Sequence, residues 1–145
     1  MTLKFDYVKF QRPVKSKVLG PSAIWPIIDI ELATDTKSLR YSALVDSGAD
    51  FCIFDAEIGE NLGIDVRSGH KELFGGIQKI DKQAEAFFHP IQLIVGGKKS
   101  YTMVSFSYDI GKSAFGVLGQ VGFFDLFIVK FDFKKERVEL TERPA

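Results

Sequence analysis

Residues 43–54 read ALVDSGADFCIF, two apolar stretches on either side of a short polar loop that carries the carboxylates Asp46 and Asp50. The apolar residues before Asp46 predict a buried strand that ends on this carboxylate and presents it on the floor of a cleft. Gly48 allows a sharp turn, and the Ser47 hydroxyl can bond to backbone across it. Asp-Ser-Gly alone is more typical of an ordinary β-turn, so its surroundings decide what it does.

Most of the chain consists of short apolar stretches of strand type, separated by Gly, Pro and Asp. Pro90 indicates an edge position or a bulge in its strand. Helix signals are few: residues 55–62, with Asp55 as N-cap and Gly63 as the stop, and residues 122–126. We expect a mostly-β fold, a barrel or folded sheet with one or two short helices, and strands at residues 27–32, 41–45, 86–95, 101–108, 127–133 and 137–140.

The size and charge of the chain limit the number of domains and the classes of partner that we expect. A length of 145 residues suits a single domain over residues 1–145, in which residues 1–20 form an edge strand or a loose arm. The 19 basic and 19 acidic residues give no net charge, which argues against nucleic acid and membrane lipid as partners. No signal peptide and no apolar run of about 18 residues is seen, so we expect a cytoplasmic protein.

Two further motifs follow the Asp-Ser-Gly loop. Residues 73–77, LFGGI, place a glycine pair in an apolar hairpin, and Val117-Leu118-Gly119 precedes another apolar strand. With these motifs the chain resembles the retropepsin-like aspartic peptidases, the single-lobe relatives of pepsin, over about residues 41–133. That family combines an apolar run entering Asp-Ser/Thr-Gly-Ala, a glycine-rich flap, and an apolar-apolar-Gly motif. The resemblance implies a closed, barrel-like β lobe that is active as a symmetric homodimer.

The resemblance also implies a chemistry. The chain has no second Asp-Ser/Thr-Gly, so Asp46 from each of two subunits would meet at a two-fold axis. Two carboxylates about 3 Å apart share one proton. The ionised one activates a water, and the protonated one hydrogen-bonds the scissile carbonyl. We expect an endopeptidase that cuts extended peptide or protein segments without metal or cofactor. A catalytically silent peptide-binding or dimerisation module on the same fold, or a structural β domain, remains an alternative.

The same resemblance assigns roles to other residues. Ser47, Gly48 and Ala49 would support the catalytic loop, with Ser47 bonding across the dimer interface. Because Ala49 cannot donate a side-chain hydrogen bond to the ionised pair, we expect activity at mildly acid pH. Gln120 stands where viral members commonly have an Arg that pairs with the carboxylate matching Asp50. Residues expected to contact substrate are Asp50, Phe74, Gly75, Gly76, Ile77, Val117 and Leu118. A solvated turn for Asp50, a plain hairpin for residues 73–77 and core packing for Val117 and Leu118 stay open.

Other kinds of site fit the sequence less well. A calcium loop starting at Asp46 fails at Gly48 and at Phe51, where the loop needs a ligand and a glycine. Cys52 could pair with His70 or His89 as a nucleophile, but its apolar neighbours favour a buried, inert thiol. Two histidines and one cysteine are too few for a zinc site. The glycines of residues 116–122 have the wrong spacing for dinucleotide binding.

Overall fold

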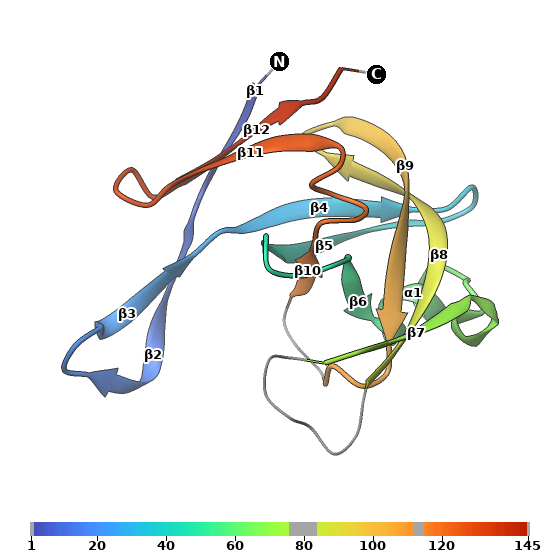
Figure 1. The fold of residues 1–145 in the computed structure, drawn as a ribbon, viewed down its shortest axis with the longest axis horizontal. Coiled ribbons are helices and arrows are strands. Elements are labelled where there is room, and N and C mark those ends of the chain that lie inside the picture. The colour runs from blue at the N-terminus through green and yellow to red at the C-terminus, as the bar shows by residue number, and fades with distance from the viewer. Residues whose placement is uncertain (1, 76–83, 112–114, 145) are drawn as a thin grey trace.

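The chain is built almost entirely from β-strands, which confirms the predicted mostly-β fold class (Figure 1). The computed structural model describes residues 2–75, 84–111 and 115–144. Its helical elements are α1 (Ala56–Asn61) and the 3₁₀ turn η1 (Val66–Ser68). The strands are β1 (Thr2–Asp6), β2 (Val8–Ser16), β3 (Gly20–Trp25), β4 (Ile27–Ala33), β5 (Ser38–Val45), β6 (Ile53–Asp55), β7 (His70–Phe74), β8 (Ala84–Val95), β9 (Lys98–Ser107), β10 (Gly116–Leu118), β11 (Phe127–Asp132) and β12 (Arg137–Glu142).

The main sheet closes on itself. Its order is β4-β5-β10-β6-β9-β8-β7, and an additional pairing of β4 with β8 joins the run from β4 to β8 into a barrel. On the side of β8 that faces away from β9, β7 pairs with residues 84–88 and β4 pairs with residues 92–94. Pro90 lies between these two partners, where the ladder is interrupted and a missing N–H does least harm. The closed barrel that the resemblance implied is therefore present.

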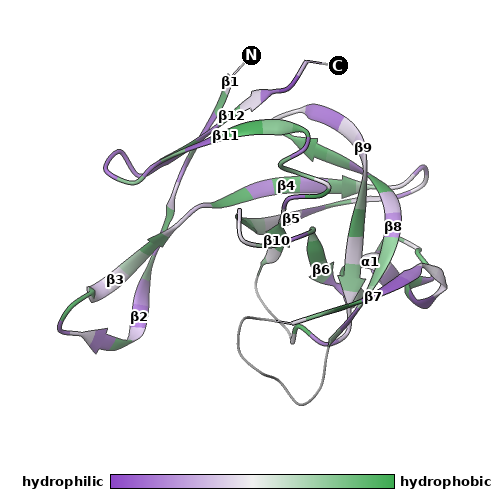
Figure 2. Ribbon diagram, viewed as in Figure 1, coloured by the Kyte–Doolittle hydropathy of each residue, from purple (hydrophilic) through white to green (hydrophobic). Residues whose placement is uncertain are grey.

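The barrel interior is a continuous apolar core. Along β4 the side chains of Ile28, Ile30 and Leu32 are buried while Asp29 is exposed, the alternation expected of a strand with one face inward. Figure 2 shows β6 as hydrophobic and the turn between β11 and β12 as hydrophilic. The largest completely buried side chains come from separate parts of the sequence and include Phe54, Phe106 and Phe123, Leu93 and Leu118.

One of the two predicted helices forms and the other does not. The Asp55 side chain caps α1 by accepting a hydrogen bond from Glu57 N at 3.0 Å, and Gly63 with φ +82° ends it, as predicted. The prediction of a helical turn at residues 122–126 is wrong, because this segment is a series of turns. Gly122 has φ +103°, which a helix excludes, and its N–H donates to the Asp125 side chain at 3.1 Å.

The first 25 residues form two separate elements. β1 pairs antiparallel with β12, so that β1, β12 and β11 make a three-stranded sheet. β2 and β3 pair with each other in a two-stranded hairpin, residues 8–25, that projects away from the barrel and is called the arm below (Figure 1). β1 is thus an edge strand of the three-stranded sheet, and the arm follows it in the sequence. None of the helices in the described ranges has the length and apolarity needed to cross a lipid bilayer.

Candidate functional site

Asp46 follows directly on β5, at one end of the barrel. β5 runs parallel to β10, with Val45 opposite Leu118. Backbone hydrogen bonds extend this pairing to the end of the strand: Asp46 N donates to Leu118 O at 3.0 Å, and Val45 N donates to Pro26 O at 2.9 Å. The main chain entering the loop is therefore held from both sides, which fixes where the Asp46 side chain begins.

The loop after Asp46 folds back on the carboxylate. Gly48 N donates to Asp46 Oδ1 at 2.9 Å, and Ala49 N donates to Asp46 O at 3.2 Å. A Cβ on Gly48 would lie 3.3 Å from Asp46 Oδ1, so a glycine suits this close approach. Asp46 is half-buried and Ser47 is exposed. The turn thus orients a carboxylate that remains accessible at the end of the barrel.

A second segment, residues 119–121, packs against this loop and braces it, that is, holds it in place through hydrogen bonds. Gln120 N donates to Ala49 O at 2.8 Å, and Gln120 Nε2 donates to Ser47 O at 2.9 Å. Gly119 is so close to the loop that an added Cβ would lie 2.4 Å from Phe51 O. Residues 119–121, which follow Val117-Leu118, therefore pack against the Asp-Ser-Gly loop.

Gln120 does not take the role that an arginine has in viral members. Its side chain bonds the Ser47 carbonyl of the Asp46 loop. Asp50 is exposed, and its backbone carbonyl accepts a hydrogen bond from Val121 N at 3.0 Å. Sequence reasoning identified Gln120 as a departure but missed this bracing contact. A glutamine two residues before a positive-φ glycine gives no signal of which carbonyl it will reach.

Cys52 is buried and bonded to residues 119–121. Its side chain is completely buried, and its Sγ accepts from Gly119 N at 3.4 Å and donates to Val121 O at 3.6 Å. Burial raises the pKa of the Cys52 thiol to about 12, so the reactive thiolate is scarce at neutral pH. The predicted burial of this thiol is confirmed.

The segment predicted as a flap forms an antiparallel hairpin. β7 pairs with β8 from His70↔Phe88 to Phe74↔Ala84. Gly75 is exposed at the end of β7, whereas the predicted contact residues Gly76 and Ile77 lie outside the described residues. Two predicted contact residues thus lie at the described end of this hairpin, Phe74 and Gly75.

Aromatic rings link this hairpin to the Asp46 loop. Phe51 stacks edge-on against Phe74, with ring centroids 6.0 Å apart, and against Phe88, at 4.9 Å. All three rings are partly exposed, so they are accessible to a ligand as well as packed against one another. Sequence reasoning missed this cluster, because the three residues belong to separate strands and loops whose proximity depends on the closure of the sheet.

The remaining candidate residues differ in how far their side chains are exposed to solvent. Leu118 is completely buried in the core, whereas Val117 is partly exposed, so Val117 is the one of the pair that could contact a ligand. His70 lies 2.9 Å from a Glu72 carboxylate oxygen on the surface, and His89 Nε2 lies 2.7 Å from Val66 O. Within the described ranges no group of three or more His, Cys, Asp or Glu is arranged to hold a metal ion.

Comparison with solved structures identifies the fold. The chain is similar to a retropepsin-like aspartic protease from Rickettsia conorii, with a TM-score of 0.61 and 14% identity over 97% of this chain and 98% of that one. It also matches the EIAV protease complexed with the inhibitor HBY-793, with a TM-score of 0.45 and 20% identity over 74% of this chain and 88% of that one. No protein-family model and no curated protein matches the sequence. The first of these structures establishes a retropepsin-like fold.

Proposed function

We propose that the chain is an aspartic endopeptidase that acts as a symmetric homodimer and hydrolyses peptide bonds in extended polypeptide segments. The observation that carries this proposal is the setting of Asp46. Its carboxylate is partly exposed at the end of the parallel β5–β10 pair, and the loop around it is bonded to residues 118–121. A carboxylate held in this way suits catalysis, because orientation is supplied before the substrate arrives.

The need for a dimer follows from the chemistry. Hydrolysis by carboxylates requires one ionised group to take a proton from water and one protonated group to hydrogen-bond the carbonyl oxygen. The sequence contains one Asp-Ser-Gly loop, so the second group would be Asp46 of another copy. When the peptide bond breaks, the water oxygen forms the new acid and the leaving nitrogen receives a proton from the pair. No metal or cofactor takes part in this route.

The surroundings of Asp46 suit a peptide with apolar side chains. Phe51, Phe74 and Val117 are partly exposed apolar residues contributed by the loop, the β7–β8 hairpin and β10. The β7–β8 hairpin would close over the substrate and reduce the access of water to the carboxylates. Asp50, exposed beside the loop, would bind substrate backbone N–H groups.

The direct test is cleavage of a mixed peptide library between pH 3 and 7 by the wild-type protein and by Asp46→Asn. Loss of one proton-transfer group should lower the rate by about 10²- to 10⁴-fold. Asp35→Asn is the matched control, because Asp35 is exposed on the turn between β4 and β5, at the other end of these strands from Asp46. This control should cleave like the wild type.

Three results would refute the proposal. Equal cleavage by the wild type and Asp46→Asn would assign the activity to another residue or to a contaminant. Sedimentation velocity at increasing protein concentration should show a dimer, and a strict monomer even with a peptide inhibitor present would rule out the shared pair of carboxylates. A dimer that binds peptides but cuts none would support the catalytically silent alternative.

A further inference from the structure

The arm, residues 8–25, is a structural element without a layer to pack on. In the described part of the chain, β2 and β3 pair with each other and with no other strand. A two-stranded hairpin on its own is at best marginally stable in water. Figure 1 shows the arm extending away from the barrel, so the barrel of the same chain covers only its root. Its length therefore calls for packing against something else.

The tip of the arm exposes three aliphatic side chains. Val14, Val18 and Leu19 are 80%, 90% and 63% exposed. Single exposed apolar residues are ordinary, but three within six residues at the end of one hairpin form a patch that water solvates poorly. The tip thus has the composition of a contact surface.

The root of the arm lies beside the Asp46 loop. Trp25 contacts Phe115, the residue before β10, with ring centroids 5.8 Å apart, and it contacts Phe10 at 4.9 Å. The next residue, Pro26, accepts a hydrogen bond from Val45 N at 2.9 Å. If Asp46 lies near a two-fold axis, each arm begins next to that axis and leads away from its own barrel. An arm that begins there and leads away from its own barrel can reach the partner subunit.

The distribution of charge also favours a second copy of the chain as the partner of the arm. The arm contains Lys9, Arg12, Lys15 and Lys17 and no acidic residue, so it carries four positive charges. Because the whole chain has equal numbers of basic and acidic residues, everything outside the arm has a net charge of −4. The arm of one copy is therefore attracted to the body of another, which favours encounter and orientation.

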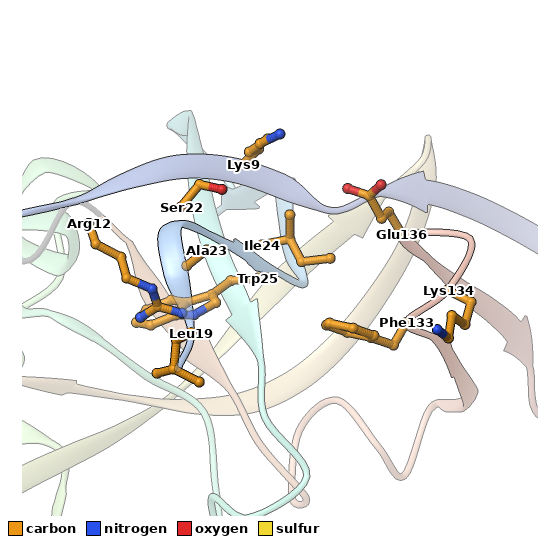
Figure 3. A pocket seen from close by; sticks show the side chains of 10 residues that line it. All are labelled: Lys9, Arg12, Leu19, Ser22, Ala23, Ile24, Trp25, Phe133, Lys134 and Glu136. Carbon is orange, nitrogen blue, oxygen red and sulfur yellow. The ribbon is translucent and has the colours of Figure 1, made fainter. Parts of the chain in front are cut away.

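A groove beside the arm, lined by residues from Trp25 at the root to Leu19 at the tip, contains an unsatisfied polar group. It measures about 430 Å³ and lies between the arm and the turn after β11, with Trp25 and Phe133 among its lining residues (Figure 3). Phe133 is 66% exposed, and Arg12 Nε is buried without a hydrogen-bond partner in the described residues. A buried donor without an acceptor is destabilising, so a carbonyl or carboxylate brought in from outside the chain would be favourable here.

We propose that the arm is a dimerisation element that packs against a second copy of this chain. The tip residues Val14, Val18 and Leu19 pack on the partner's barrel, and Arg12 receives an acceptor from the partner. The inference rests on the proposed homodimer. It adds that residues 8–25, outside the barrel, contribute contact that holds the dimer together.

The first test compares dimer dissociation constants by sedimentation equilibrium. Replacing Val14, Val18 and Leu19 together by Ser should weaken the dimer by about 100-fold or more. The matched control is Tyr101→Ser, because Tyr101 is 76% exposed on β9 and lines a hollow with residues 33–35, beyond the end of β4 that is distant from Asp46. Peptide cleavage by the triple variant should fall at low protein concentration and recover at high concentration, since Asp46 is unchanged. An unchanged dissociation constant would overturn the proposal.

The second test asks what the tip contacts. Cys52 is buried, so Val18→Cys provides a single accessible thiol for a benzophenone photocrosslinker. With mixed ¹⁴N- and ¹⁵N-labelled subunits, the crosslinks should join light to heavy chains, whereas Thr36→Cys at the β4–β5 turn should give few such products. Crosslinks confined to one chain would contradict the proposal. So would binding to phosphatidylserine vesicles that depends on the three tip residues while the dimer constant stays the same.

The two proposals can fail separately. A cleaving wild type whose dimer constant is insensitive to the tip would remove the arm proposal and leave the peptidase intact. A dimer that depends on the tip but cuts no peptide would support the arm and refute the peptidase. A monomeric and inactive wild type would refute both.

Discussion

Substitution of Gly119 by Ala tests whether residues 119–121 hold the Asp46 loop in place. A Cβ at this position would lie 2.4 Å from Phe51 O and 2.8 Å from Ala49 O, much closer than ordinary van der Waals contact. Both contacts are with backbone, so no side-chain rotation can relieve them. The added methyl group must push the loop that carries Asp46 away from β10, or break the bonds that Gln120 makes to it.

The expected cost can be worked from this geometry. Overpacking a close-packed site costs about 1–3 kcal/mol, and contact with rigid backbone favours the upper half of that range. For a protein of this size each kcal/mol lowers the melting temperature by roughly 2–4 °C, so Gly119→Ala should melt about 5–10 °C below the wild type. Thermal and urea unfolding followed by circular dichroism measure both quantities.

The control for Gly119→Ala is Gly75→Ala. A Cβ on Gly75 meets no atom of the described residues within 4 Å and its φ is not positive, so its unfolding free energy should change by less than about 0.5 kcal/mol. Peptide cleavage adds a second readout: Gly119→Ala should lose more activity than its unfolded fraction explains, because the displaced atoms follow Asp46 directly. If Gly119→Ala melts like Gly75→Ala and cleaves like the wild type, residues 119–121 do not hold the Asp46 loop in place.

Two further variants probe the neighbours of the loop. Because the folded pKa of Cys52 is raised from 9.0 to about 12, the contribution of this thiol to stability is complete below pH 9 and declines above it by about 1 kcal/mol per pH unit. Cys52→Ala should therefore flatten the alkaline decline of the unfolding free energy measured in urea. An equal decline in the wild type and the variant would contradict the raised pKa. Phe51→Ala removes ring contacts to Phe74 and Phe88, each worth about 0.5–1.5 kcal/mol. The KM for peptide should therefore rise several-fold to tenfold, with a smaller change in kcat. If KM is the same in Phe51→Ala as in a Tyr101→Ala control, these rings do not position the hairpin.

Features set by neighbouring residues could be predicted from the sequence. The cap at Asp55 and the stop at Gly63 each depend on a few adjacent residues, and both appear where the sequence indicates. The strand ending on Asp46 belongs to the same class, because an uninterrupted apolar run before a polar loop is a local signal. These features cover the candidate catalytic loop itself.

Features that depend on closure of the sheet could not be predicted. The pairing of β4 with β8 joins residues about 60 positions apart, and nothing in either strand specifies the other. The contacts of Phe51 with the β7–β8 hairpin follow from that closure. At residues 122–126 the apolar pattern favoured a helical turn, but the positive φ of Gly122 and its bond to Asp125 override it. Tertiary contacts decided each of these cases.

The bracing contacts bear on how a dimer would work. Asp46 is positioned by bonds to Leu118 and by its own loop, Ser47 by Gln120, and all of these groups belong to one chain. Half of the proposed site is therefore complete in a single subunit, and association would add a second half of the same shape without refolding either one. Affinity can then be supplied by a separate element, and the arm has the exposed apolar tip and the opposite charge for that purpose. Changes in the arm would then alter how often the two carboxylates meet while leaving their geometry unchanged.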